Sequence, residues 1–181
     1  MADLVSILNS LSLSLPWMQT MIVSFAYVAG MAMIFAALYK LKQYGELRSM
    51  MSSQTDFRGP VVTILSGTAL IYLPRALEIM MTTFFGYDSP IAYEADEGNR
   101  WSDVVAVVIY IVQIVGIVSF IKGWILLSRS ASNQGQHQML TKALVHVFGG
   151  LVAINIVGVV EIFNKTLGTD IGFTPSLMIS P

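Results

Sequence analysis

Four long apolar stretches, separated by polar or charged segments, dominate the hydropathy pattern of the chain. They cover approximately residues 18–41, 59–81, 104–127 and 142–163. A helix needs about 20 apolar residues to cross the roughly 30 Å hydrocarbon core of a bilayer. The pattern therefore predicts an all-α membrane protein with four transmembrane helices, each crossing the bilayer once.

The second and fourth apolar stretches share a spacing of glycine and glutamate. In each stretch a glycine precedes a glutamate by the same number of residues, Gly67 and Glu78 in one, Gly150 and Glu161 in the other. Aligning the first and third stretches superposes Gly30 on Gly116. We predict two tandem helical hairpins, which form a parallel repeat because each repeat contains an even number of spans.

These boundaries divide the chain into five segments. We expect an amphipathic N-terminal segment (1–16), a first hairpin (17–85), an acidic linker (86–103), a second hairpin (104–164) and a C-terminal tail (165–181). The first segment has leucines at helical spacing but is too short to span. It is interpreted as lying on the membrane surface, with an unstructured tail as the alternative, and Pro16 is expected to mark a turn.

Small residues in the apolar stretches are candidates for close helix packing. A small residue lets the backbone of another helix approach, within the chain or in an assembly. The candidates are Ala26, Gly30, Thr63, Gly67, Gly116, Gly149, Gly150 and Gly158. Pro74 is expected to kink the second span, because it removes a backbone hydrogen bond. The small residues of the fourth span are expected to make it the smoothest helix of the four.

Charged residues fall into two groups. Arg75, Glu78 and Glu161 lie near the far ends of their spans. In a straight helix Arg75 would sit roughly 22 Å and Glu78 roughly 27 Å from the start of the span, near the outer boundary. There they form an ion pair that either snorkels to the headgroups or lines a pore or subunit contact.

The second group of charges is basic and occupies the two predicted hairpin tips, at Lys40, Lys42, Arg48, Arg58, Arg129 and Lys142. With Lys122, seven basic residues lie on this side against three, Arg75, Arg100 and Lys165, on the other. The positive-inside rule then places both tips inside and the termini and acidic linker outside.

Composition excludes several classes of site. The chain is 55% apolar and 12% charged, with a net charge of −1, no cysteine and two histidines. A basic nucleic-acid binder, a disulfide framework and a thiolate metal site are excluded. No catalytic constellation or phosphate-binding loop is evident, so we expect neither an enzyme nor a bound cofactor. An uncleaved N-terminus is expected, since a basic region before the first apolar stretch is missing.

The segment FRGPVVTILSGTALIYLP, preceded by a spanning helix that ends in Tyr-Lys-Leu-Lys, resembles the DotE/IcmC family of type IVB secretion systems and their TraQ-like counterparts in plasmid conjugation. The resemblance covers mainly residues 18 to 80. It implies a bacterial inner-membrane protein of an apparatus that moves DNA or effector proteins, with nucleic acid at most as cargo. Each hairpin also resembles the two-helix pilins of conjugation machines, which implies a pilin-like subunit packed with phospholipid, in an extracellular pilus as well as the membrane.

Two functions follow as hypotheses. The first is a structural, pilin-like or channel-forming subunit that assembles as a homo-oligomer with other secretion-system subunits and membrane lipid. The second is a small transporter or ion channel with polar waypoints at Arg75, Glu78, Gln113 and Glu161, which would have to be buried and face one another. An accessory scaffold without a conduit is a third possibility.

Overall fold

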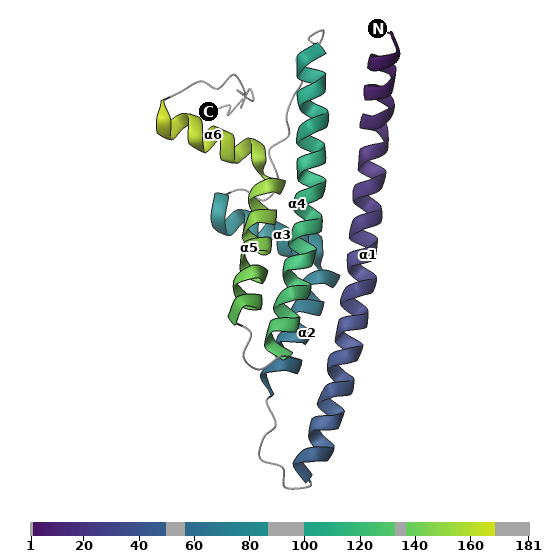
Figure 1. Ribbon diagram of the computed structural model, residues 1–181, viewed down its shortest axis with the longest axis vertical. Coiled ribbons are helices and arrows are strands. Elements are labelled where there is room, and N and C mark those ends of the chain that lie inside the picture. The colour runs from purple at the N-terminus through teal and green to yellow at the C-terminus, as the bar shows by residue number, and fades with distance from the viewer. Residues whose placement is uncertain (1, 50–56, 87–99, 133–136, 169–181) are drawn as a thin grey trace.

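A computed structural model describes residues 2–49, 57–86, 100–132 and 137–168, and all of these segments are helical (Figure 1). The helices are α1 (Ala2–Ser49), α2 (Arg58–Ile71), α3 (Leu73–Phe85), α4 (Arg100–Ser132), α5 (His137–Ile154) and α6 (Ile156–Leu167). The described residues contain no strand, which confirms the all-α prediction. Most of the predicted acidic linker and C-terminal tail lies outside the described residues.

Two helices are long and apolar enough to cross a membrane, within Ser14–Glu46 of α1 and Val104–Ala131 of α4. The pairs α2/α3 and α5/α6 also pass the same test of length and composition when each is taken as one bent span, so the described residues hold two to four candidate spans. These helices indicate a membrane protein.

The turn predicted at Pro16 is wrong, because α1 continues through this proline as one helix of 48 residues. A proline deletes only one backbone donor, and hydroxyl side chains nearby bond to carbonyls along the same helix. Ser14 Oγ donates to the carbonyl oxygen of Ser10 at 2.8 Å, and Thr20 Oγ1 donates to that of Pro16 at 3.1 Å. The carbonyl oxygen that Pro16 leaves without its helical N–H donor is that of Ser12, four residues earlier, and neither of these two bonds reaches it.

The kink predicted at Pro74 is present as a sharp bend two residues earlier, and the fourth apolar stretch has a second bend that was not predicted. The axis bends by 95° between α2 and α3, at Tyr72, and by 82° between α5 and α6, at Asn155. Pro74 lies just beyond the first bend, in the first turn of α3, where a missing N–H has no intrahelical partner to lose.

The two bends have the same backbone conformation although only one is followed by a proline. Tyr72 has φ −97° and ψ 36°, and Asn155 has φ −104° and ψ 38°. Val157 occupies the place after Asn155 that Pro74 has after Tyr72. The proline is therefore not a requirement for this geometry.

The hydrophobic core joins α1, α2, α3, α4 and α5. Its buried residues come from five helices and are Ala26, Leu70, Leu73, Ile117, Phe120, Val147 and Ile154. In Figure 1, α4 stands between α1 and α5, while α3 and α6 turn away from the common axis of the longer helices. The upper parts of α1 and α4 extend beyond the two bends.

Candidate functional site

The first helix crossing is formed by two of the predicted packing glycines, Gly30 in α1 and Gly67 in α2. A Cβ atom on Gly30 would lie 2.7 Å from the carbonyl oxygen of Gly67, and one on Gly67 would lie 2.9 Å from that of Gly30. Both distances are well inside van der Waals contact, which is about 3.5 to 4.0 Å. Only glycine allows the two backbones to approach this closely. Ala26, one turn before Gly30, is buried in the core.

The second crossing repeats the first between α4 and α5. A Cβ atom on Gly116 would lie 2.9 Å from the carbonyl oxygen of Gly150, and one on Gly150 would lie 2.7 Å from that of Gly116. Gly123 extends this crossing, because its Cβ would lie 2.7 Å from the backbone nitrogen of Val147. Sequence reasoning missed Gly123, although its spacing of seven residues from Gly116 places both on one face of α4.

Two other small residues of the predicted set have different surroundings. No atom lies within 4 Å of where a Cβ on Gly149 would be, and this residue is exposed on α5. The expected close packing at Gly149 is therefore absent within the described chain. Gly158 is buried in α6.

Thr63 joins the two hairpins rather than the two arms of one hairpin. Ser128 Oγ of α4 donates a hydrogen bond to Thr63 Oγ1 at 3.0 Å, and Thr63 Oγ1 donates to the carbonyl oxygen of Gly59 at 2.8 Å. Both hydroxyls are buried. Along the same face of α2, Ser66 and Leu70 are fully buried. We call this contact of α2 with α4 the inter-hairpin junction. Ser128 carries no sequence signal for such a bond, because the two partners are 65 residues apart.

The acidic residues of the bends each pair with a basic residue of the same helix. In α3, Arg75 donates a hydrogen bond to Glu78, as predicted from their spacing. In α6, Lys165 Nζ lies 2.7 Å from Glu161 Oε1. Lys165 was not recognised as a partner. The straight-helix depth estimate for Arg75 and Glu78 is wrong, because α3 turns aside at Tyr72 instead of continuing along the axis of α2.

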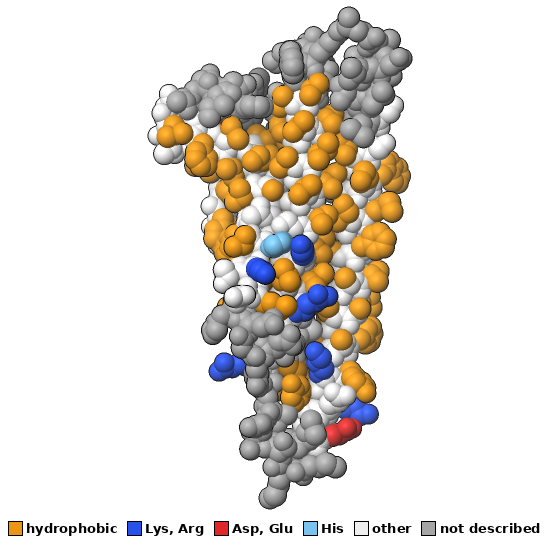
Figure 2. Space-filling view, viewed as in Figure 1, with side chains coloured by type: hydrophobic (Ala, Val, Ile, Leu, Met, Phe, Trp, Pro, Cys, Tyr) orange, Lys and Arg blue, Asp and Glu red, His pale blue; other side chains and the backbone are white. Residues whose placement is uncertain are grey.

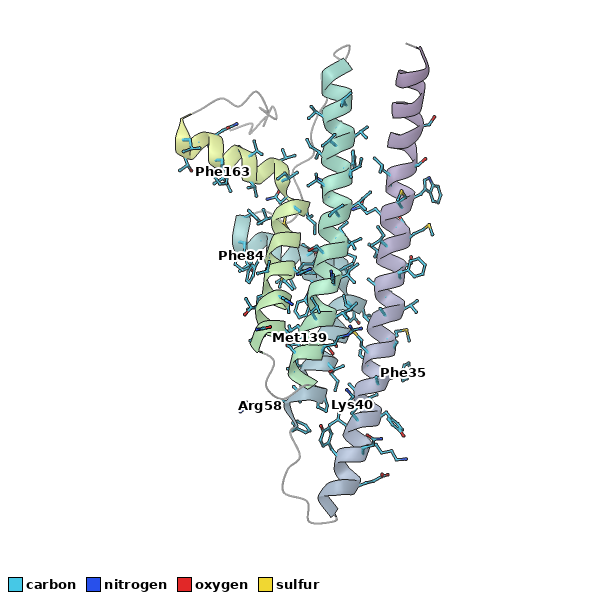
Figure 3. The ribbon with its side chains drawn as sticks, viewed as in Figure 1. Phe35, Lys40, Arg58, Phe84, Met139 and Phe163 are labelled. Carbon is cyan, nitrogen blue, oxygen red and sulfur yellow. The ribbon has the colours of Figure 1, made fainter. Side chains whose placement is uncertain are left out.

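The described basic side chains of the predicted tips lie away from the end of the molecule that holds the N-terminus. Figure 2 shows that Lys and Arg side chains on the displayed face lie in its middle and lower parts, whereas apolar side chains cover the upper part. In Figure 3, Lys40 of α1 and Arg58 of α2 lie at nearly the same level, below Met139 of α5. Arg129 and Lys142 are exposed, and the side chain of Arg48 lies outside the described ones.

Two further contacts hold the second hairpin. Ser119 Oγ of α4 donates to the carbonyl oxygen of His146 in α5 at 3.2 Å. The rings of Phe84 in α3 and Phe148 in α5 meet edge to face, with centroids 5.4 Å apart. This ring contact connects the bent arm of the first hairpin to the second hairpin.

The contacts described above join helices to one another or pair charges within one helix. Within the described residues no group of three His, Cys, Asp or Glu side chains could hold a metal ion. Gln113 is half-buried in α4, and Arg75 is largely exposed. The charges found at the bends are compensated locally in their own helices. Comparison of the chain with protein-family models, curated proteins and solved structures finds no match.

Proposed function

We propose that the chain is a structural membrane subunit that assembles with copies of itself. The observation that carries this proposal is the repetition of one packing unit. Gly150 follows Gly67 by 83 residues, and the bend at Asn155 follows the bend at Tyr72 by the same 83 residues. In both units a glycine crossing precedes the bend by five residues. These features support two tandem hairpins of a parallel repeat, four spans in all.

The surface of the molecule supports assembly in a membrane. Large apolar side chains are exposed along α1 and α4, among them Trp17 and Phe25 in α1 and Val115 in α4. Contiguous exposed apolar surface indicates contact with lipid or with other protein. Phospholipid between subunits is a ligand that suits this surface.

The place of this subunit is proposed from the resemblance to the DotE/IcmC family. It is a component of a type IVB or conjugative secretion apparatus in the bacterial inner membrane, with both basic tips inside, and it forms a pilus-like filament or a channel ring. DNA or protein is its cargo and other secretion subunits are its partners. The transporter alternative is less well supported, because Arg75 pairs with Glu78 and Glu161 pairs with Lys165 within their own helices.

Gene deletion and complementation test this function. Donor cells without the chain should lose transfer of a conjugative plasmid or of an effector protein. The wild type and Leu144→Ala, a change at an exposed position of α5, should restore transfer. Gly150→Leu should fail, because the larger side chain would meet backbone atoms of α4. Membrane levels of each variant are measured in parallel. Normal transfer in the deletion strain would refute the proposed role.

A further inference from the structure

Each of the two helix faces that meet at the inter-hairpin junction has an equivalent face elsewhere in the repeat. One equivalent face lies on α5 and the other on α1, and within one chain these two faces do not meet. Applying the shift of 83 residues converts Thr63, Ser66 and Leu70 of α2 into His146, Gly149 and Ala153 of α5. In α2 all three residues are buried, and Thr63 bonds to Ser128 of α4. In α5 the same face has an exposed Gly149 with open space beside it, and His146 and Ala153 are half-buried.

The α4 side of the junction has a counterpart on α1. Gly116 follows Gly30 by 86 residues, and the same shift converts Ser128 of α4 into Lys42 of α1. It converts Trp124, one turn before Ser128, into Leu38. Leu38 is 51% exposed and the Lys42 side chain is 73% exposed. Figure 3 shows Phe35, one turn earlier on α1, on the side facing away from the other helices.

We infer that the α5 face of one copy packs against the α1 face of the next copy, and that this contact repeats the inter-hairpin junction between chains. The inference rests on the proposed function and specifies the contact through which copies would assemble. In Figure 1, α1 and α5 stand on opposite sides of α4 and run in opposite directions, as α2 and α4 do. Such a contact gives all copies the same orientation in the membrane and builds a ring or a filament.

Hydrogen-bonding groups at the two edges match those of the junction. Thr63 donates to the carbonyl four residues earlier and accepts from Ser128. Similarly, His146 Nδ1 lies 2.9 Å from the carbonyl oxygen of Lys142, four residues earlier. Because a carbonyl only accepts, Nδ1 donates, and Nε2 of the neutral ring is left as an acceptor. Lys42, which takes the place of Ser128, is a donor.

Charges at the edges are also complementary. One turn beyond His146 and Lys42, the antiparallel register brings Lys142 of one copy opposite Glu46 of the next. Glu46 lies 3.9 Å from Lys42 in its own helix, and both side chains are more than half exposed. A second ammonium from Lys142 would leave this carboxylate between two lysines. The tip end of the contact would then be held by an ion pair.

Disulfide cross-linking tests the contact directly, because the chain has no cysteine. Two differently tagged chains are expressed together, one with Leu38→Cys and the other with Gly149→Cys, and are oxidised in native membranes. The control replaces Gly149→Cys with Leu144→Cys, which is exposed on α5 but lies roughly 140° around the helix. We expect a disulfide-linked heterodimer in the first mixture, in several-fold excess over the control.

A charge exchange gives a second readout. Lys142→Glu should reduce the cross-linked fraction, and adding Glu46→Lys should restore it. Native mass spectrometry of the same membranes measures assembly independently. If oligomers form but the two mixtures cross-link equally, or Glu46→Lys does not restore cross-linking to Lys142→Glu, this contact is refuted. Self-assembly itself would still stand. Membranes that contain only single chains would refute both the contact and the proposed function.

Discussion

The crossing of α4 and α5 can be tested by comparing two adjacent glycines of the same helix, Gly149 and Gly150. An added methyl group at Gly150 would lie 2.7 Å from the carbonyl oxygen of Gly116 and 2.7 Å from the backbone nitrogen of Phe120. To restore ordinary van der Waals distances around this methyl group, α4 and α5 must move apart by on the order of 1 Å. At Gly149 the methyl group would meet no atom within 4 Å.

The difference between Gly150→Ala and Gly149→Ala isolates the cost of this overpacking. Both variants gain a similar helix propensity of up to about 1 kcal/mol, which cancels in the comparison. Overpacking typically costs about 1–3 kcal/mol, so Gly150→Ala should be less stable than Gly149→Ala by that amount. Every 1.4 kcal/mol changes the ratio of folded to unfolded protein about tenfold. Equal free energies of unfolding would refute the close crossing.

The assay is reversible unfolding of monomeric protein by SDS in mixed micelles, followed by tryptophan fluorescence. Monomers are used so that a contact between copies at Gly149 does not enter the comparison. The far-UV circular dichroism of both variants should remain helical, because the substitution separates two helices without breaking either.

Two further predictions concern the bend and the inter-hairpin junction. Pro74→Ala should keep the bend at Tyr72, since the equivalent bend at Asn155 forms without proline. Spin labels at Val61 and Thr83 should remain roughly 22 Å apart, whereas a distance of about 33 Å would indicate a straight helix and contradict this prediction. A double-mutant cycle with Thr63→Val and Ser128→Ala should give a coupling free energy of about 0.6 kcal/mol, and at most about 1.7 kcal/mol. A coupling free energy of zero would show that the hydrogen bond between these two residues contributes nothing to stability.

The apolar pattern was sufficient to predict the helical arms and the pair of glycines that meets at each crossing. Gly30, Gly67, Gly116 and Gly150 stand out because small residues in long apolar helices have few other uses. Gly123 could also have been found, since it lies two turns after Gly116 on one face of α4.

The bends could not be predicted correctly from local sequence. Pro16 lies within a continuous helix, whereas Asn155 marks a bend of 82° with no proline at all. A proline is therefore not sufficient for a bend, as Pro16 shows, and not necessary for one, as Asn155 shows.

The same limit applies to the contacts between hairpins. The bond between Thr63 and Ser128 joins residues from different apolar stretches, and neither residue type specifies its partner. The pair of Arg75 and Glu78 was predictable from its spacing of three residues, and Lys165 could have been assigned to Glu161 by its spacing of four. Local charge pairs are thus accessible from sequence, whereas packing partners are not.

The most direct test of self-assembly is cryo-electron microscopy of the chain, in material sheared from donor cells and in detergent-extracted membranes. We expect repeated copies in one orientation, as a helical filament or a closed ring, with α5 of each copy against α1 of the next. Single chains in both preparations would contradict self-assembly.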